Sequence, residues 1–294
     1  QRFKNPFFAL LITFFYITSP RIFAESFYNC KDIVFMSFAV MSIHYALRSF
    51  ENFSFKNIFF FSMLTAFATN VRVMGIFIFF LFLFFLLLSS LEEKRFLKKN
   101  INKLFCLIIF YAFITFVFWP FLWESPINNF MFTLKSFANF NMSFEIFYLG
   151  EFYNIKNLPW HYIPIWIFVT TPLIFFIFFL VGFLNINILF FKNFCNLSNK
   201  NKLWKNIEQK KDFFILLFFT IPIFLVIFLN STLYTGWRHL YFIYPCLTYF
   251  IALGLKFIFT KKNLKPYKET FVAIVGLSLI LNTYNLIKLH PYQN

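Results

Sequence analysis

Hydrophobic runs of membrane-spanning length are the feature that most constrains this chain. Stretches such as Gly75 to Leu88 and Leu173 to Leu180 have no polar face to present to water, so they must face lipid or other helices. The 294 residues are 60% hydrophobic and only 13% charged, which is far outside the range of soluble domains. We therefore predict an all-α protein, a polytopic bundle of about nine transmembrane helices. The expected spans are 6–18, 33–47, 55–70, 73–91, 104–120, 163–190, 213–230, 239–259 and 270–287.

The loops between these runs alternate in their Lys and Arg content. One side holds 20 of the 27 cations and the other holds seven. The positive-inside rule makes the rich side cytoplasmic, so we expect the N-terminus inside and the C-terminus outside. The net charge of +16 is then a topology signal that anionic membrane lipids can match. It does not indicate a nucleic-acid partner, because the sequence contains no folded basic module.

The longest outer loop, 121–162, contains a segment suited to the membrane surface. Phe residues alternate with Asn and Lys from Pro126 to Phe140, which predicts an interfacial helix. Because no repeat or Gly/Ser-rich linker divides the chain, we expect 1–294 to form a single domain. The four cysteines have no metal-ligand spacing, so we predict neither a disulfide framework nor a zinc site, and we expect no cofactor.

Two carboxylates occur in the first outer loop, close to a membrane boundary. Glu25 and Asp32 are seven positions apart, so on one helix they would share a face, with Arg21 four residues before Glu25. One interpretation is a surface ion pair between Arg21 and Glu25, with Asp32 favouring the start of the next helix. The other is that Glu25 and Asp32 are candidate catalytic acids at the mouth of the bundle.

Two outer arginines run against the positive-inside trend. Arg72 lies in a tight turn shortly before Gly75, and Arg238 is followed by His239. Either arginine could anchor the chain to lipid headgroups. A guanidinium also presents a planar fork of donors that matches phosphate. We therefore predict that Arg72, Arg238 and His239 bind a phosphate group.

Aromatic residues accompany these charges on the predicted outer side. Trp160 and His161 lie between two prolines, and Trp237 precedes Arg238. An interfacial aromatic belt explains Trp160 but not His161, whose imidazole can donate to a phosphate or a sugar hydroxyl. Because sugar rings pack well on indole rings, we predict that Trp160, His161 and Trp237 contact a sugar or an acceptor.

The short motifs between the hydrophobic runs resemble bacterial members of the GT-C glycosyltransferase superfamily, in particular relatives of protein O-mannosyltransferases and aminoarabinose transferases. The motifs are SPRIFAESFYNCKDI, ATNVRVMGI, WPFLWESP, LPWHYIPIWIFVTTP, YTGWRHLYFIYP and KLHPYQ. The resemblance implies a hexosyltransferase of the bacterial inner (plasma) membrane. Such an enzyme takes a sugar from a polyprenyl-phosphate carrier on the non-cytoplasmic face, and the sequence does not identify its acceptor.

The resemblance also implies that part of the enzyme lies outside this chain. In the superfamily the catalytic acid usually lies in the first outer loop after the first transmembrane helix, and no segment here matches that loop. We therefore expect a fragment that lacks the first helix with its outer loop, and a C-terminal outer part. The principal acid is then expected before Gln1.

A lipid-linked sugar or polysaccharide transporter, or flippase, without chemistry is the alternative function. A transporter is expected to place charges at the middle of the bilayer and to have repeated halves with broken helices. Here the charges lie at predicted outer helix ends and the halves do not repeat, which favours the enzyme. A structural membrane subunit, the third option, would make no use of Arg72 and Arg238.

Overall fold

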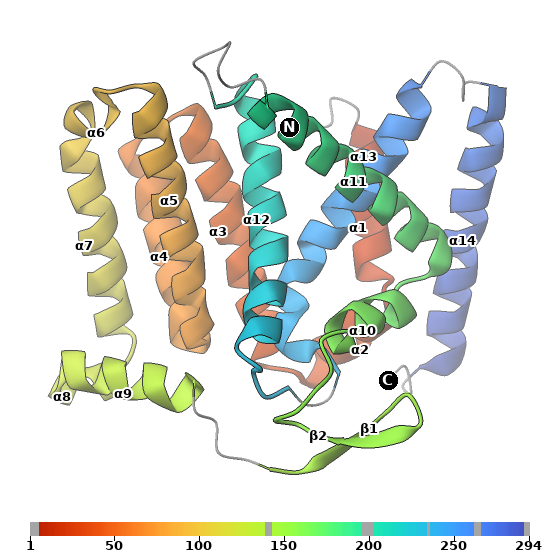
Figure 1. Ribbon diagram of the computed structural model, residues 1–294, viewed down its shortest axis with the longest axis horizontal. Helices are drawn as coiled ribbons and strands as arrows, with labels where there is room; N and C mark the ends of the chain where they lie inside the picture. Colours follow the sequence, from red (N-terminus) through yellow and green to blue (C-terminus); the bar gives the residue numbers. More distant parts are fainter. Residues whose placement is uncertain (1–5, 139–142, 196–202, 234–235, 262–265, 291–294) are drawn as a thin grey trace. The chain divides into compact units, whose positions relative to one another are not determined.

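The computed structural model describes residues 6–138, 143–195, 203–233, 236–261 and 266–290, which are helical almost throughout (Figure 1). The chain divides into two compact units, which are described separately. Unit 1 comprises Gln1–Ile33, Pro159–Lys192 and Thr235–Asn294, and unit 2 comprises Val34–Leu158 and Asn193–Tyr234.

Most elements fall within one unit. The helices of unit 1 are α1 (Pro6–Ile17), α2 (Pro20–Tyr28), α10 (Tyr162–Thr170), α11 (Leu173–Cys195, except its last turn), the 3₁₀-helix η3 (Arg238–Ile243), α13 (Tyr244–Thr260) and α14 (Lys268–Leu289). The elements of unit 2 are α3 (Asp32–Glu51, except its first two residues), α4 (Phe55–Val71), the 3₁₀-helix η1 (Val73–Gly75), α5 (Ile76–Glu92), α6 (Phe96–Lys99), α7 (Ile101–Val117), α8 (Phe121–Glu124), α9 (Pro126–Ala138), β1 (Glu145–Tyr148), β2 (Glu151–Asn154) and α12 (Ile207–Phe228).

The predicted integral membrane protein is confirmed, but the prediction of nine spans is wrong. Among the described residues, six helices are long and apolar enough to cross a membrane, and a bent helix pair gives up to seven. The six are α3, η1 with α5, α11, α12, η3 with α13, and α14.

Helix length explains the difference. Helices α4 and α7 have 17 residues each, which is about 26 Å at 1.5 Å per residue and less than the ~30 Å hydrocarbon core. The first predicted span, 6–18, corresponds to α1 alone, and α2, which lies in the predicted first outer loop, meets α1 at an angle of 60°. The span predicted at 163–190 is also two helices, α10 and α11, because Pro172 interrupts the helix after Thr170.

Polar side chains and one glycine hold α4 against its neighbours in unit 2. The hydroxyl of Ser62 donates to the Leu107 carbonyl at 3.0 Å, and the hydroxyls of Thr69 and Tyr111 share a hydrogen bond of 2.9 Å. A Cβ on Gly75 would lie 2.5 Å from the backbone nitrogen of Thr69. The glycine therefore lets η1 fold back directly onto the last turn of α4.

Two buried lysines lie at the end of unit 2 where α3 and α5 finish. Lys211 forms ion pairs with Glu51 and Glu208, the second at 3.1 Å. Lys210 donates to the hydroxyl of Ser89, and its ammonium lies 4.9 Å from the centroid of a phenylalanine ring. Both lysines belong to the cation-rich side predicted from the sequence. They also connect α12 to α3 and α5.

A helix, α9, is present where the interfacial helix was predicted, although residues 139–140 lie outside the described part of the chain, and its location at a membrane surface stays a prediction. In Figure 1, α8 and α9 run across the ends of α4, α5 and α7. The loop also contains a β-hairpin that was not predicted, in which β1 pairs antiparallel with β2. Its turn places Leu149 at φ 53° and Gly150 at φ 93°.

A polar tie stabilises the bend of the α1–α2 pair in unit 1. The helix breaks at Thr18 and Ser19, and Pro20 begins α2 as its first residue. The side-chain amide of Asn282 on α14 donates to the Thr18 carbonyl at 2.9 Å. The Thr18 carbonyl is therefore not left without a hydrogen bond at the break, because α14 supplies the donor.

Two glycines allow a close crossing of α11 and α13. A Cβ on Gly182 would lie 2.0 Å from the carbonyl oxygen of Phe250, and one on Gly254 would lie 2.0 Å from the carbonyl oxygen of Phe178. Both backbones approach closely, as in small-residue interfaces of membrane helices.

Candidate functional site

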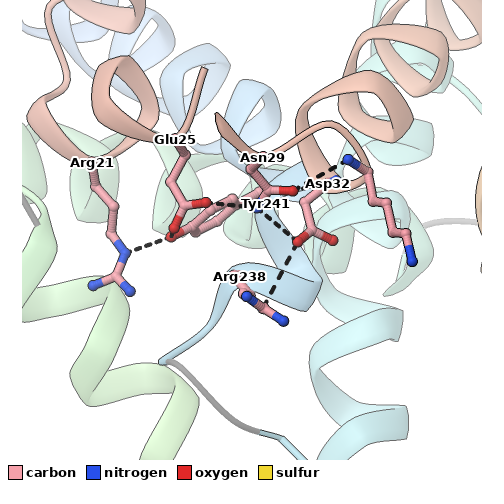
Figure 2. A network of polar contacts seen from close by, with 7 residues as sticks. Arg21, Glu25, Asn29, Asp32, Arg238 and Tyr241 are labelled. Atoms are coloured by element: carbon pink, nitrogen blue, oxygen red, sulfur yellow. Dashed lines mark hydrogen bonds and ion pairs between the residues drawn. The ribbon is translucent and has the colours of Figure 1, made fainter. Parts of the chain in front are cut away.

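A polar network in unit 1 joins two carboxylates, two arginines, an amide and a phenol (Figure 2). Its members come from α2, from the turn after α2, from the first residue of α3 and from η3. They are Arg21, Glu25, Asn29, Asp32, Arg238 and Tyr241.

The local sequence brings the carboxylates together in a way that a single helix would not. Helix α2 ends at Tyr28, and α3 begins at Asp32, so Glu25 and Asp32 lie on two different helices. Asn29 caps α2, with its backbone N–H donating to the Glu25 carbonyl at 2.8 Å. The short turn that follows returns Asp32 to the end of α2, where it lies at the N-terminus of α3 and favours the helix dipole.

The side chain of Asn29 bridges the two carboxylates. Its amide nitrogen donates to Glu25 Oε2 at 2.6 Å and to Asp32 Oδ2 at 2.9 Å. Its oxygen accepts from the backbone N–H of Asp32 at 2.9 Å. Glu25 and Asp32 are each only 3% exposed. Buried carboxylates are stable only when they are hydrogen-bonded and paired, and Asn29 supplies a donor to both.

Tyr241 connects Glu25 to Arg21. The Arg21 Nε–H donates to the phenol oxygen, and the phenol donates to Glu25 Oε1 at 3.2 Å. One interpretation of the sequence paired Arg21 directly with Glu25. In the structure Tyr241, from η3, lies between them and hydrogen-bonds to both. The Arg21 guanidinium carbon also lies 5.2 Å from the ring centroid of Trp166, within the range of cation–π attraction.

Arg238 forms an ion pair with Asp32. Its Nε lies 3.9 Å from Asp32 Oδ2, and the two side chains are 29% and 4% exposed. This distance is longer than a charge-assisted hydrogen bond, so the pair is a loose ion pair. Two arginines and two carboxylates make the formal charge of the network zero.

Trp237 packs inside unit 1. It is 1% exposed, its indole N–H donates to the Thr170 hydroxyl at 3.1 Å, and its ring lies 5.2 Å from that of Tyr241 and 5.9 Å from that of Tyr244. The burial does not support its predicted role as a surface on which a sugar stacks. Trp237 instead holds η3, and with it Tyr241, against α10.

Trp160 and His161 begin α10. Trp160 is 69% exposed, and its ring lies 5.6 Å from the imidazole of His161. His161 is partly buried, and its carbonyl accepts the backbone N–H of Ile165 at 3.0 Å. Burial raises the pKa of the neighbouring Tyr162 phenol, which therefore stays protonated at neutral pH. Of the two predicted tryptophan surfaces, Trp160 is the exposed one.

The remaining predicted cations occupy different units. His239 follows Arg238 in η3 and is partly buried. Arg72 belongs to unit 2, where it caps α4 with its N–H donating to the Ala68 carbonyl at 2.9 Å. Its carbonyl accepts from Gly75 at 2.8 Å. The network in Figure 2 is built from unit 1 alone.

Sequence reasoning missed Asn29, Tyr241 and Trp166. A local signal existed for two of them. Asn29 precedes Asp32 by three residues, a spacing typical of an asparagine that caps a turn. Tyr241 follows Arg238 by three residues, and in a 3₁₀-helix such residues share a face. No local signal points to Trp166.

Among the described residues, no group of three or more His, Cys, Asp or Glu side chains is arranged to hold a metal ion. No family model matches the chain, and neither the curated proteins nor the solved structures give a match. The GT-C resemblance therefore depends on the short sequence motifs alone.

Proposed function

We propose that this chain is a membrane hexosyltransferase of the GT-C type. It transfers a sugar from a polyprenyl-phosphate donor to an acceptor on the non-cytoplasmic face of the inner membrane. The observation that carries the proposal is the pair of buried carboxylates, Glu25 and Asp32, joined by one amide and flanked by Arg21 and Arg238.

The chemistry of transfer matches this set of groups. The acceptor hydroxyl attacks the anomeric carbon and loses its proton to a carboxylate, while the bond from that carbon to the phosphate oxygen breaks. The polyprenyl phosphate leaves with the bonding electron pair, and cations stabilise the charge that develops on it. Arg238 and His239, adjacent in η3 of unit 1, are proposed to bind this phosphate, and Arg72 of unit 2 stays a separate prediction. Glu25 and Asp32 border the acceptor and are the candidate catalytic acids.

Exposed apolar helices support a lipid-linked donor. In the membrane-length windows of α14 and α11, 17% and 28% of the residues are buried. A donor held in the bilayer must approach sideways between helices, and such surfaces suit contact with a polyprenyl chain. Trp160 and His161, at the start of α10, are the proposed sugar contacts.

The test is transfer itself. The full-length protein in lipid is incubated with radiolabelled polyprenyl-phosphate sugars and a panel of acceptors, and labelled product is measured. The proposed function predicts transfer from at least one donor. Absence of transfer with every donor, together with substrate flux across sealed vesicles, would replace the enzyme with a transporter.

One observation favours that second candidate. The α1–α2 pair is a broken helix with a 60° bend, and broken helices form the substrate sites of many transporters. The flux measurement above decides between the two, because a transporter moves the intact lipid-linked sugar and a transferase consumes it.

A further inference from the structure

We propose that the predicted cytoplasmic end of the α3–α4 pair binds the headgroup of an anionic membrane phospholipid through Arg48, Lys56 and His44. This lipid site belongs to unit 2 alone and does not depend on the proposed function. Its three basic side chains are not part of the network in Figure 2.

Two pairs of aromatic rings show how α3 and α4 lie side by side in unit 2 (Figure 1). The ring of Tyr45 stacks on that of Phe60 at 5.0 Å, and the ring of Phe38 lies 5.4 Å from that of Phe67. Residue numbers rise along α3 while they fall along α4, so the two helices are antiparallel. The end of α3 therefore lies beside the start of α4.

Arg48 and Lys56 lie together at that end of the helix pair. Arg48 follows Tyr45 by three residues, and Lys56 precedes Phe60 by four. These spacings keep each cation on the face of its helix that carries the stacked ring. Both side chains are exposed, and in the part of the chain that the structure describes neither forms an ion pair. The two cations can therefore bind one anion from neighbouring helices.

The surroundings of the two cations add no compensating negative charge. Glu51, three residues after Arg48, forms an ion pair with Lys211 of α12. Lys103 of α7 adds a further cation, which donates to the Phe53 carbonyl between α3 and α4 at 2.7 Å. A headgroup with a net negative charge therefore fits this end better than a zwitterionic headgroup.

His44 separates a lipid site from the general attraction of surface cations to a membrane. It lies four residues before Arg48 on the same exposed face of α3. The 20 residues of α3 span about 30 Å, the thickness of the hydrocarbon core, and His44 lies seven residues before Glu51, about 10 Å inside. Long Lys and Arg side chains reach the interface from such positions, but an imidazole does not. The phosphate or ester oxygens of a lipid held by Arg48 give its N–H an acceptor.

The surface next to the three basic residues suits acyl chains. Met41 lies three residues before His44 on the same face, and Met41, Val40 and Phe59 are exposed. Helix α3 is long and apolar enough to cross the membrane, so these side chains face lipid. Cations at the helix end and apolar side chains beside them match the two parts of an anionic phospholipid.

The experiment measures lipid-induced stabilisation of the purified full-length protein in a nonionic detergent. Its unfolding temperature is followed in titrations with phosphatidylglycerol, with phosphatidylcholine of the same acyl chains, and with inorganic phosphate. A ligand that binds only the folded state stabilises it according to its concentration relative to Kd. We expect a larger stabilisation by phosphatidylglycerol than by phosphatidylcholine, and none by inorganic phosphate at the same concentration. Equal stabilisation by the two lipids, or by inorganic phosphate, would overturn the proposal.

Variants then assign the contacts. Arg48→Gln should bind phosphatidylglycerol about 10- to 100-fold more weakly, because it loses charge-assisted hydrogen bonds. Arg95→Gln is the matched control, since it removes the same charge from an exposed arginine between α5 and α6 on the same predicted side. It should bind as wild type does. Lys56→Gln should also weaken binding and tests the site independently of Arg48, and the unfolding temperature without lipid reports whether each variant is folded.

His44→Phe tests the residue that lies deeper in the membrane. It keeps a flat ring but removes the N–H donor, so the affinity for phosphatidylglycerol should fall about 3- to 10-fold. Equal weakening in Arg48→Gln and Arg95→Gln, with wild-type affinity in His44→Phe, would show a diffuse attraction of surface cations and contradict the lipid site. None of these measurements involves sugar transfer, so the lipid site can fail while the proposed function stands.

Discussion

At the scale of single residues, the network depends on neutral side chains that form hydrogen bonds to two charged groups at once. Tyr241 and Glu25 lie 216 residues apart in the sequence, and the phenol joins the buried Glu25 to the partly buried Arg21. Such a side chain stabilises the folded protein mainly by satisfying its charged partners, because a buried charge without a hydrogen bond is costly.

Tyr241→Phe should therefore destabilise the protein. It removes the acceptor of Arg21 and the donor to Glu25 without changing the packed ring, so we expect a loss of about 1–3 kcal/mol in the free energy of unfolding. Chemical denaturation in mild detergent measures it. Tyr284→Phe, on a residue that is 58% exposed, should stay within about 0.5 kcal/mol of wild type. Equal stability of the two variants would contradict the bridging role of Tyr241.

Glu25 and Asp32 show how far the sequence predicts the site. Their spacing would put the two acids on one face only if a single helix carried both, and α2 ends between them. The turn at Asn29 brings them together instead. Tyr241 and Trp166 reach the site only through the packing of unit 1, and no pattern local to Glu25 encodes that packing.

At the scale of elements, the helices were easier to predict than their ends. The amphipathic pattern after Pro126 correctly gave α9, because its period is local. The count of nine spans was wrong because the short hydrophobic runs at 55–70 and 104–120 were counted as spans, although the helices they form, α4 and α7, have 17 residues each and are too short to cross the hydrocarbon core upright. The hairpin was missed because its strands have four residues each, which is too short for a clear alternation.

The crossing of α11 and α13 yields a prediction at this scale. Gly182→Ala inserts a methyl group 2.0 Å from a backbone carbonyl, which cannot rotate away, so the helices must separate. We expect a loss of about 1–3 kcal/mol, measured by thermal or chemical unfolding. Gly276→Ala in α14 is the matched control, because nothing lies within 4 Å of its added methyl group. A Gly182→Ala variant as stable as this control would show that the crossing is looser than described.

At the scale of the whole molecule, the native cysteines test the predicted sidedness. Cys30 and Cys195 are exposed, Cys246 is buried, and Cys106 is partly buried in α7. The asymmetry of Lys and Arg predicts that Cys30 lies outside and Cys195 lies in the cytoplasm. A membrane-impermeant maleimide applied to intact cells should therefore label Cys30, and should label Cys195 only after permeabilisation. Cys30→Ser and Cys195→Ser identify the labelled site, and the reverse pattern would invert the topology.

The central claim is that the network in unit 1 performs sugar transfer, and turnover by carboxylate variants tests it most directly. Initial rates of the full-length protein are measured for Glu25→Gln and Asp32→Asn, with Glu124→Gln as the control for an exposed acid on the same predicted side. Each amide keeps the shape of the side chain but cannot accept a proton or balance an arginine. The proposed function predicts that the two network variants, at wild-type folded yield, lose about 100-fold or more in rate while Glu124→Gln stays near wild type. Wild-type rates in all three variants would contradict the claim and leave the network as a structural element of unit 1.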